Sequence, residues 1–175
     1  MEGTSEKLEK DPDFSKQIKE KGGINLYTCI QCGTCSGSCP GGKVTAYRTR
    51  MIIRNALVGL KSKVLSSDEI WLCTTCRICA SRCPRGIDVT KAILTIRNMA
   101  VDAGYALKAH KILATQAMMT GCALGGNLNE TIQELRHSLG LSRTPISITY
   151  VADPKPLADF RRLISEVGLD KLMQL

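Results

Sequence analysis

Eight of the nine cysteines in this chain fall into two runs with the same spacing. The first cysteine run extends from Cys29 to Pro40 and the second from Cys73 to Pro84, and each reads C-x2-C-x2-C-x3-C-P. A tightly wrapped loop can present its first three thiols to one metal centre, whereas a fourth thiol must come from farther away. Each closing proline fixes φ and removes an N–H, which turns the chain away from the centre. The pattern therefore predicts two polynuclear metal sites built by one domain.

This spacing is typical of two-cluster bacterial ferredoxins, in which the fourth cysteine of each run binds the cluster of the other run. Applied here, the rule predicts two [4Fe-4S] clusters as cofactors, and no residue is assigned a catalytic role. The first thiol set is Cys29, Cys32, Cys35 and Cys83, and the second thiol set is Cys73, Cys76, Cys79 and Cys39. The exchanged cysteines would join the two runs and hold the clusters close enough for an electron to pass between them.

Zinc and disulfides are the two other common uses of cysteine. Structural zinc sites usually pair C-x2-C knuckles with His or further Cys ligands, and a triple run ending in C-P fits that arrangement poorly. A disulfide framework suits small secreted chains, and this sequence shows no secretory apolar segment. Cys122 lies outside both runs among small residues, so we interpret it as a buried packing residue.

The composition restricts location and partners. No apolar run reaches the ~18 to 20 residues of a membrane helix, so we expect a cytoplasmic protein without a membrane span. The formal net charge is +8, which two clusters held by eight thiolates would lower but leave positive. Because there is no run of five Lys or Arg residues and no interleaved aromatics, we do not expect a nucleic-acid partner.

Helical patterns surround the two runs. We expect residues 1–7 to be disordered, and a short helix with Asp11 and Pro12 at its start and Gly22 at its end. Between the runs, Gly41 and Gly42 predict a flexible corner, and residues 44–60 predict one helix of about four turns. Ser66 to Glu69 matches a capping box that starts a short helix leading into Cys73.

Four further segments follow the second run. We expect one helix capped by Asp88 and stopped at Gly104, and a second from about 107 to 119. A third is capped by Asn129 and stopped at Gly140, and the last runs from Asp153 to Gly168. Residues 144–151 alternate in a way that suits a short extended segment. The fold class is thus mostly α, with an N-terminal helix or arm (1–23), a two-cluster helical domain (24–104) and a C-terminal helical extension (105–175).

Other reactive residue types have ordinary interpretations. His110 and His137 are isolated on helical segments, and Met99, Met118 and Met119 suit core or interface packing. Arg77, Arg82 and Arg85 flank the second run, where they would balance the negative charge of a cluster or raise its potential. The sequence contains neither a glycine-rich phosphate loop nor a nucleophile with a positioned base.

The residues that flank the two cysteine runs resemble those of one particular protein family. The segments 25–29, 38–42, 70–76 and 83–88, together with the length, resemble the C subunits of heterodisulfide reductases from methanogenic archaea, within the α-helical ferredoxin family. The double run alone is shared with the iron-sulfur subunits of succinate dehydrogenase and glycerol-3-phosphate dehydrogenase. The eight cysteines assigned above match the ligands of the C subunits position by position.

The resemblance implies an iron-sulfur relay subunit in methanogenesis. In that family a flavin-containing A subunit bifurcates electrons, a catalytic B subunit with CCG motifs reduces the CoB–CoM heterodisulfide, and the C subunit passes electrons from A to B. Some members also bind a hydrogenase, and their reaction is coupled to ferredoxin reduction. Because CCG motifs are absent here, the chain should belong to an oxidoreductase without being catalytic alone.

Two alternatives remain. A succinate or glycerol-3-phosphate type dehydrogenase subunit would usually add a [2Fe-2S] domain or a second cysteine-rich domain, for which this length leaves no room. A nucleic-acid-binding protein with a structural cluster is more distant, and strongly salt-dependent binding would support it.

Overall fold

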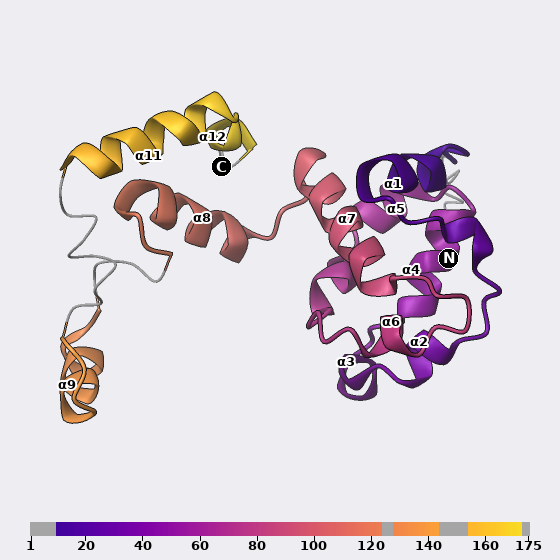
Figure 1. The fold of residues 1–175 in the computed structure, drawn as a ribbon, viewed down its shortest axis with the longest axis horizontal. Coiled ribbons are helices and arrows are strands. Elements are labelled where there is room, and N and C mark those ends of the chain that lie inside the picture. Colours follow the sequence, from indigo (N-terminus) through magenta and orange to yellow (C-terminus); the bar gives the residue numbers. More distant parts are fainter. Residues whose placement is uncertain (1–9, 124–127, 144–153, 173–175) are drawn as a thin grey trace, which may run out of the picture. The chain divides into compact units, whose positions relative to one another are not determined.

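In the computed structural model, the chain divides after Tyr105 into two units (Figure 1). The structure describes residues 10–123, 128–143 and 154–172, and these are helical or irregular, without strands. The expected mostly α fold is confirmed. The expectations for residues 1–7 and for the extended segment 144–151 fall outside the described residues.

The first unit places both cysteine runs on short helices around one core. Its elements are α1 (Phe14–Gly22), η1 (Leu26–Thr28), α2 (Thr34–Gly37), α3 (Pro40–Val44), α4 (Thr49–Leu57), α5 (Lys61–Leu65), η2 (Asp68–Leu72), α6 (Ile78–Ser81) and α7 (Val89–Asp102). Helix α7 packs against α1, α5, α6 and η2, and α4 packs against α1, α2, α5 and η1. Aliphatic side chains from these helices form the core, with Phe14 fully buried among them.

The two cysteine runs have the same local structure. In each, a 3-10 helix ends at the first cysteine, and a four-residue α-helix carries the third. These two short helices, α2 and α6, pack against each other (Figure 1). The repeated sequence pattern therefore folds into a repeated structural unit, and the two copies meet in the interior of the domain.

The single helix expected over residues 44–60 is wrong, because the chain is irregular between α3 and α4. Thr45 donates its hydroxyl to the Gly41 carbonyl and accepts from the Tyr47 backbone N–H. The Arg48 guanidinium donates to the Gly42, Thr45 and Tyr47 carbonyls at 2.9–3.0 Å. These local bonds satisfy the backbone groups that a continuous helix would have used. Tyr47 is consequently buried, while Val44 is exposed.

Gly41 and Gly42 do not form the expected flexible corner, because both lie within α3, which begins at Pro40. A Cβ on Gly42 would come 2.8 Å from the Tyr47 carbonyl oxygen, so the residue permits a close approach of two backbone segments. Glycine is used at this position for space.

Two of the expected helix starts are displaced. Helix α1 begins at Phe14 with Asp13 at its N-cap, and Asp11 instead accepts from the backbone N–H of Asp13. The segment before Cys73 is a 3-10 helix capped by the Ser67 hydroxyl, one residue after the expected cap. Ser67 takes the capping role with its side chain, whereas the side chain of Asp13 makes no capping hydrogen bond to α1.

The second unit contains α8 (Lys108–Thr120), α9 (Glu130–Ser138), α11 (Pro154–Glu166) and α12 (Leu169–Leu172). The expected cap at Asn129 is confirmed, since its side chain accepts from the Ile132 N–H at 2.9 Å. In the first unit the expected cap at Asp88 is confirmed in the same way, since it accepts from the Lys91 N–H at 2.9 Å. Helix α11 packs against α8, and Arg161 donates to the Met119 carbonyl. The helix expected to be the last is followed by α12.

No helix in the described parts of the chain is long and apolar enough to span a bilayer.

The two phenylalanines of the chain give a test of the core. Replacing the fully buried Phe14 with alanine should lower the free energy of unfolding by about 3–5 kcal/mol, because it leaves a cavity beneath α1. Phe160→Ala is the matched control, since Phe160 is exposed on α11. Thermal unfolding of the two variants measures the difference, and equal destabilisation would contradict this assignment of the core.

Candidate functional site

Both cysteine runs curl through left-handed backbone positions on either side of their second cysteine. In the first run these are Gln31 and Gly33, with φ of 56° and 83°. In the second run they are Thr75 and Arg77, with φ of 57° and 63°. A non-glycine residue in this region costs roughly 1–2 kcal/mol, so the surrounding fold must hold it there. The result is a loop whose first three cysteines can surround one volume.

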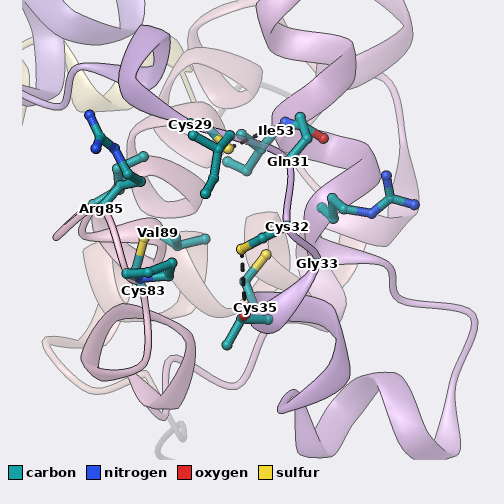
Figure 2. A pocket seen from close by; sticks show the side chains of 14 residues that line it. Cys29, Gln31, Cys32, Gly33, Cys35, Ile53, Cys83, Arg85 and Val89 are labelled. Carbon is teal, nitrogen blue, oxygen red and sulfur yellow. Dashed lines mark hydrogen bonds between the residues drawn. The ribbon is translucent and has the colours of Figure 1, made fainter.

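A cavity lies inside the first of these loops (Figure 2). All four cysteines of the first thiol set line it, with Cys83 arriving from the end of the second run. In Figure 2 the Cys83 sulfur lies on the opposite side from those of Cys32 and Cys35. Ile53 and Val89 form apolar parts of the wall, and Arg50 and Arg85 also line it. Four thiols around one enclosed volume are a suitable donor arrangement for a polynuclear cluster.

The second thiol set gathers near Tyr47 and α6. A Cβ on Gly42 would lie 2.8 Å from the Tyr47 carbonyl oxygen and 3.5 Å from Cys39 Cβ. A Cβ on Gly41 would lie 3.9 Å from Cys39 Sγ and 3.5 Å from the carbonyl oxygen of Leu72, the residue before Cys73. Cys39 belongs to the first run, so this set too combines cysteines from both runs. Cys35 lies on α2 and Cys79 on α6, and the packing of these two helices against each other brings the two sets side by side.

Burial differs along each run in the same way. Cys32 and Cys76, the second cysteines, are exposed, whereas Cys35 and Cys79, the third, are half-buried. Burial raises the pKa of the Cys35 and Cys79 thiols, and neighbouring thiolates raise it further. The Thr34 hydroxyl and backbone N–H lower the pKa of Cys32. The interior thiols therefore favour the protonated form until a bound cation stabilises their thiolates, so cluster binding must release protons.

Polar side chains approach individual thiols. The Gln31 amide donates to Cys29 Sγ at 3.3 Å, and the Thr34 hydroxyl oxygen lies 3.4 Å from Cys32 Sγ. The Thr90 hydroxyl oxygen lies 3.4 Å from Cys79 Sγ. The amide oxygen of Gln31 is buried without a hydrogen-bond partner. Hydrogen bonds to ligand sulfurs hold the ligands in place and adjust the electronic properties of the metal centre.

Arg97 is a supporting residue that the sequence pattern does not reveal. Its guanidinium donates to the Ile70 carbonyl at 2.8 Å and to the Cys73 carbonyl at 2.6 Å. It also lies over the Trp71 ring, 5.6 Å from the centroid. Arg97 thus fixes the segment that delivers the first cysteine of the second run. Its position on α7 gives no local sequence signal, because its partners are distant backbone groups.

The three arginines predicted to flank the second run differ in their contacts. Arg77 forms an ion pair with Asp88 at 2.8 Å, Arg85 donates to the Thr28 carbonyl and lines the cavity, and Arg82 is exposed. Of the three, Arg85 therefore belongs to the first site. A cation there would offset thiolate charge, as expected from the sequence.

The remaining candidate residues do not line the cavity. Cys122, interpreted from the sequence as a buried packing residue, belongs to the second unit and is only partly buried. His110 and His137 are exposed, Met99 lies in the core, and Met119 is exposed. Within the described residues, no three His, Cys, Asp or Glu side chains converge as a single-ion site.

Comparison with known proteins identifies the domain. A family model described as a 4Fe-4S dicluster domain matches residues 25–87. The two [4Fe-4S] clusters predicted from the cysteine spacing are confirmed by this match, and the two thiol sets provide suitable donors.

Similar proteins cover most of the chain. It is 40% identical over 163 residues to the C subunit of the H2:CoB-CoM heterodisulfide, ferredoxin reductase of Methanothermobacter thermautotrophicus, covering 93% of this chain and 86% of the relative. It is 44% identical to the C2 subunit of the H2/formate:CoB-CoM heterodisulfide, ferredoxin reductase of Methanococcus maripaludis, with 88% and 81% covered. It is 38% identical to the C subunit of the ferredoxin:CoB-CoM heterodisulfide reductase of Methanosarcina mazei, with 89% and 94% covered.

The contacts of Arg97 predict a local effect on the second site. Arg97→Met removes a charged donor from two carbonyls, so we expect the free energy of unfolding to fall by about 2 kcal/mol. Iron held near Cys73 should also be lost faster to a chelator, as followed by visible absorbance. Arg54→Met on the exposed side of α4 is the control. Equal rates of iron loss in the two variants would contradict the role given to Arg97.

Proposed function

The chain belongs to the family of heterodisulfide reductase C subunits, and from this premise we propose that it passes electrons from a flavin-containing A subunit to a catalytic B subunit of a CoB–CoM heterodisulfide reductase. When bound, [4Fe-4S] clusters supply one-electron transfer over a wide range of potentials. The sequence contains no CCG motif of the kind expected in the catalytic subunit. The chain therefore acts as a relay within the complex and is not catalytic alone.

The arrangement of the two thiol sets is the observation that supports a relay. The half-buried Cys35 and Cys79 lie on the two helices that pack against each other, α2 and α6, whereas Cys32 and Cys76 are exposed. A relay needs this combination, because its two redox groups must lie close to each other and each must also come close to an external partner. A single structural site would not need two exposed ends.

We also propose the crossed ligand assignment, with Cys83 serving the first site and Cys39 the second. The cavity lined by Cys29, Cys32, Cys35 and Cys83 supports this assignment, since Cys39 is absent from its wall. The reciprocal exchange is supported by the position of Cys39, whose sulfur and the carbonyl oxygen of Leu72, next to Cys73, both lie within 4 Å of a Cβ placed on Gly41. Each run would then depend on the other for a complete site.

The crossed assignment predicts which cluster each variant loses. Cys83→Ala should damage the cluster held by Cys29, Cys32 and Cys35, and Cys39→Ala should damage the other, as measured by EPR spectra of the reduced proteins. Cys122→Ala should leave both signals intact, because Cys122 lies in the second unit. Loss confined to the second-run cluster in Cys83→Ala would refute the assignment.

Organisation and location follow from the same proposal. We assign cluster binding to residues 24–104, with the N-terminal helix closing its core and residues 105–175 forming a C-terminal extension. We also propose a cytoplasmic location, because cluster assembly requires reduced thiols. The names of the Methanothermobacter and Methanococcus relatives include hydrogen as a substrate, so a hydrogenase is a further proposed partner.

The companions of the chain in its native cell test the proposed partners. Affinity purification under anaerobic conditions should recover a flavoprotein together with a subunit containing CCG motifs. Purified alone, the chain should contain both clusters yet fail to reduce the heterodisulfide. Recovery with a membrane quinone-reducing subunit in their place would support the succinate or glycerol-3-phosphate type alternative and overturn the proposal.

A further inference from the structure

A buried threonine at the start of α7 faces the second thiol set. Thr90 is 1% exposed, and its hydroxyl oxygen lies 3.4 Å from the sulfur of Cys79. Thr95, on the same helix, is also buried and instead donates to the Lys91 carbonyl, four residues earlier, at 3.0 Å. The bond made by Thr95 is the usual one for a helical threonine. Thr90 lies in the first turn of α7, where the carbonyl four residues earlier precedes the helix, and its hydroxyl is instead directed at the sulfur of Cys79.

The direction of this hydrogen bond follows from the chemistry of the ligand. A cysteine bound to iron is a thiolate and has no proton to donate. The Thr90 hydroxyl must then be the donor and Cys79 Sγ the acceptor. Because the contact is shielded from water, the electrostatic effect of the donated proton is stronger than it would be at the surface.

Further buried hydroxyl groups lie near the same thiol set. Tyr47 is 2% exposed, and its backbone lies beside Cys39. The nearby Thr49 is 1% exposed. In the first cavity, the wall residues contributed by α4 and α7 include the apolar Ile53 and Val89.

We propose that Thr90 is a positioning residue that raises the reduction potential of the second-run cluster by donating a hydrogen bond to Cys79. Reduction adds negative charge that is shared with the ligand sulfurs, and a donor to one of those sulfurs stabilises the reduced form more than the oxidised form. The inference rests on cluster binding by Cys79 and does not depend on the identity of the partners.

The first thiol set receives its hydrogen bonds from other residues, so the effect proposed for Thr90 concerns the second-run cluster alone. Gln31 donates to Cys29, and Thr34 lies beside Cys32 at the exposed edge. The Thr90 hydroxyl instead contacts a sulfur of the second set. Removing that hydroxyl should therefore leave the potential of the first-run cluster unchanged, so this cluster is an internal reference in the same molecule.

EPR-monitored redox titration of the full-length, cluster-loaded chain tests the proposal. The second-run signal is identified by its loss in Cys76→Ala, because Cys76 lies in the same run as Cys79. Thr90→Val keeps the shape of the side chain and removes the donor, so the midpoint potential of the second-run cluster should fall while that of the first stays unchanged. Thr90→Ser should restore the wild-type value. Thr95→Val, which removes a hydroxyl from the same helix away from the cysteines, should change neither potential.

Results that overturn the role of Thr90 can be distinguished from a result that overturns the proposed function. No shift in Thr90→Val, or an equal shift in Thr95→Val, would overturn the role of Thr90 while leaving the relay function standing. If Thr90→Val fails to retain iron, Thr90→Ala is compared with Thr90→Ser, and equal potentials in those two variants overturn the proposal. A wild-type chain without iron would instead refute the proposed function itself.

Discussion

The cavity of the first run is closed by a thiol from the second run. Three cysteines of the first run line this cavity, and Cys83, at the end of the second run, completes the lining. The chain must therefore fold back before these four thiols can surround one volume. The packing of α2 against α6 and the buried faces of α4 and α7 provide this return. Metal binding and the folding of the core are expected to be coupled.

The sequence predicts those parts of the fold that depend on neighbouring residues. Asp88 and Asn129 cap the helices that follow them, because an N-cap needs only a side-chain oxygen that accepts from a backbone N–H two or three residues later. The break between α3 and α4 is not predicted, since Tyr47 fits a helical stripe by spacing. Its burial comes from a loop that Arg48 holds by bonding three carbonyls. The spacing of apolar residues does not show that side-chain hydrogen bonds to these carbonyls will replace the hydrogen bonds of a continuous helix.

The candidate site shows the same division. Cysteine spacing indicates the clusters because ligand geometry is a local property of each run, and the family match confirms two of them. The supporting residues are different. Arg97 bonds the carbonyls of Ile70 and Cys73, and Thr90 contacts Cys79, through approaches that only the folded domain creates. The exposed second cysteines and the adjoining third cysteines are likewise properties of the folded loops.

The central claim is that two neighbouring [4Fe-4S] clusters occupy this small helical domain as a pathway for single electrons. EPR of the anaerobically purified and fully reduced chain tests it most directly. The account predicts signals from two reduced clusters in each chain, with splitting caused by magnetic interaction between them. A signal from one isolated cluster, or a colourless protein that holds zinc in place of iron, would contradict it.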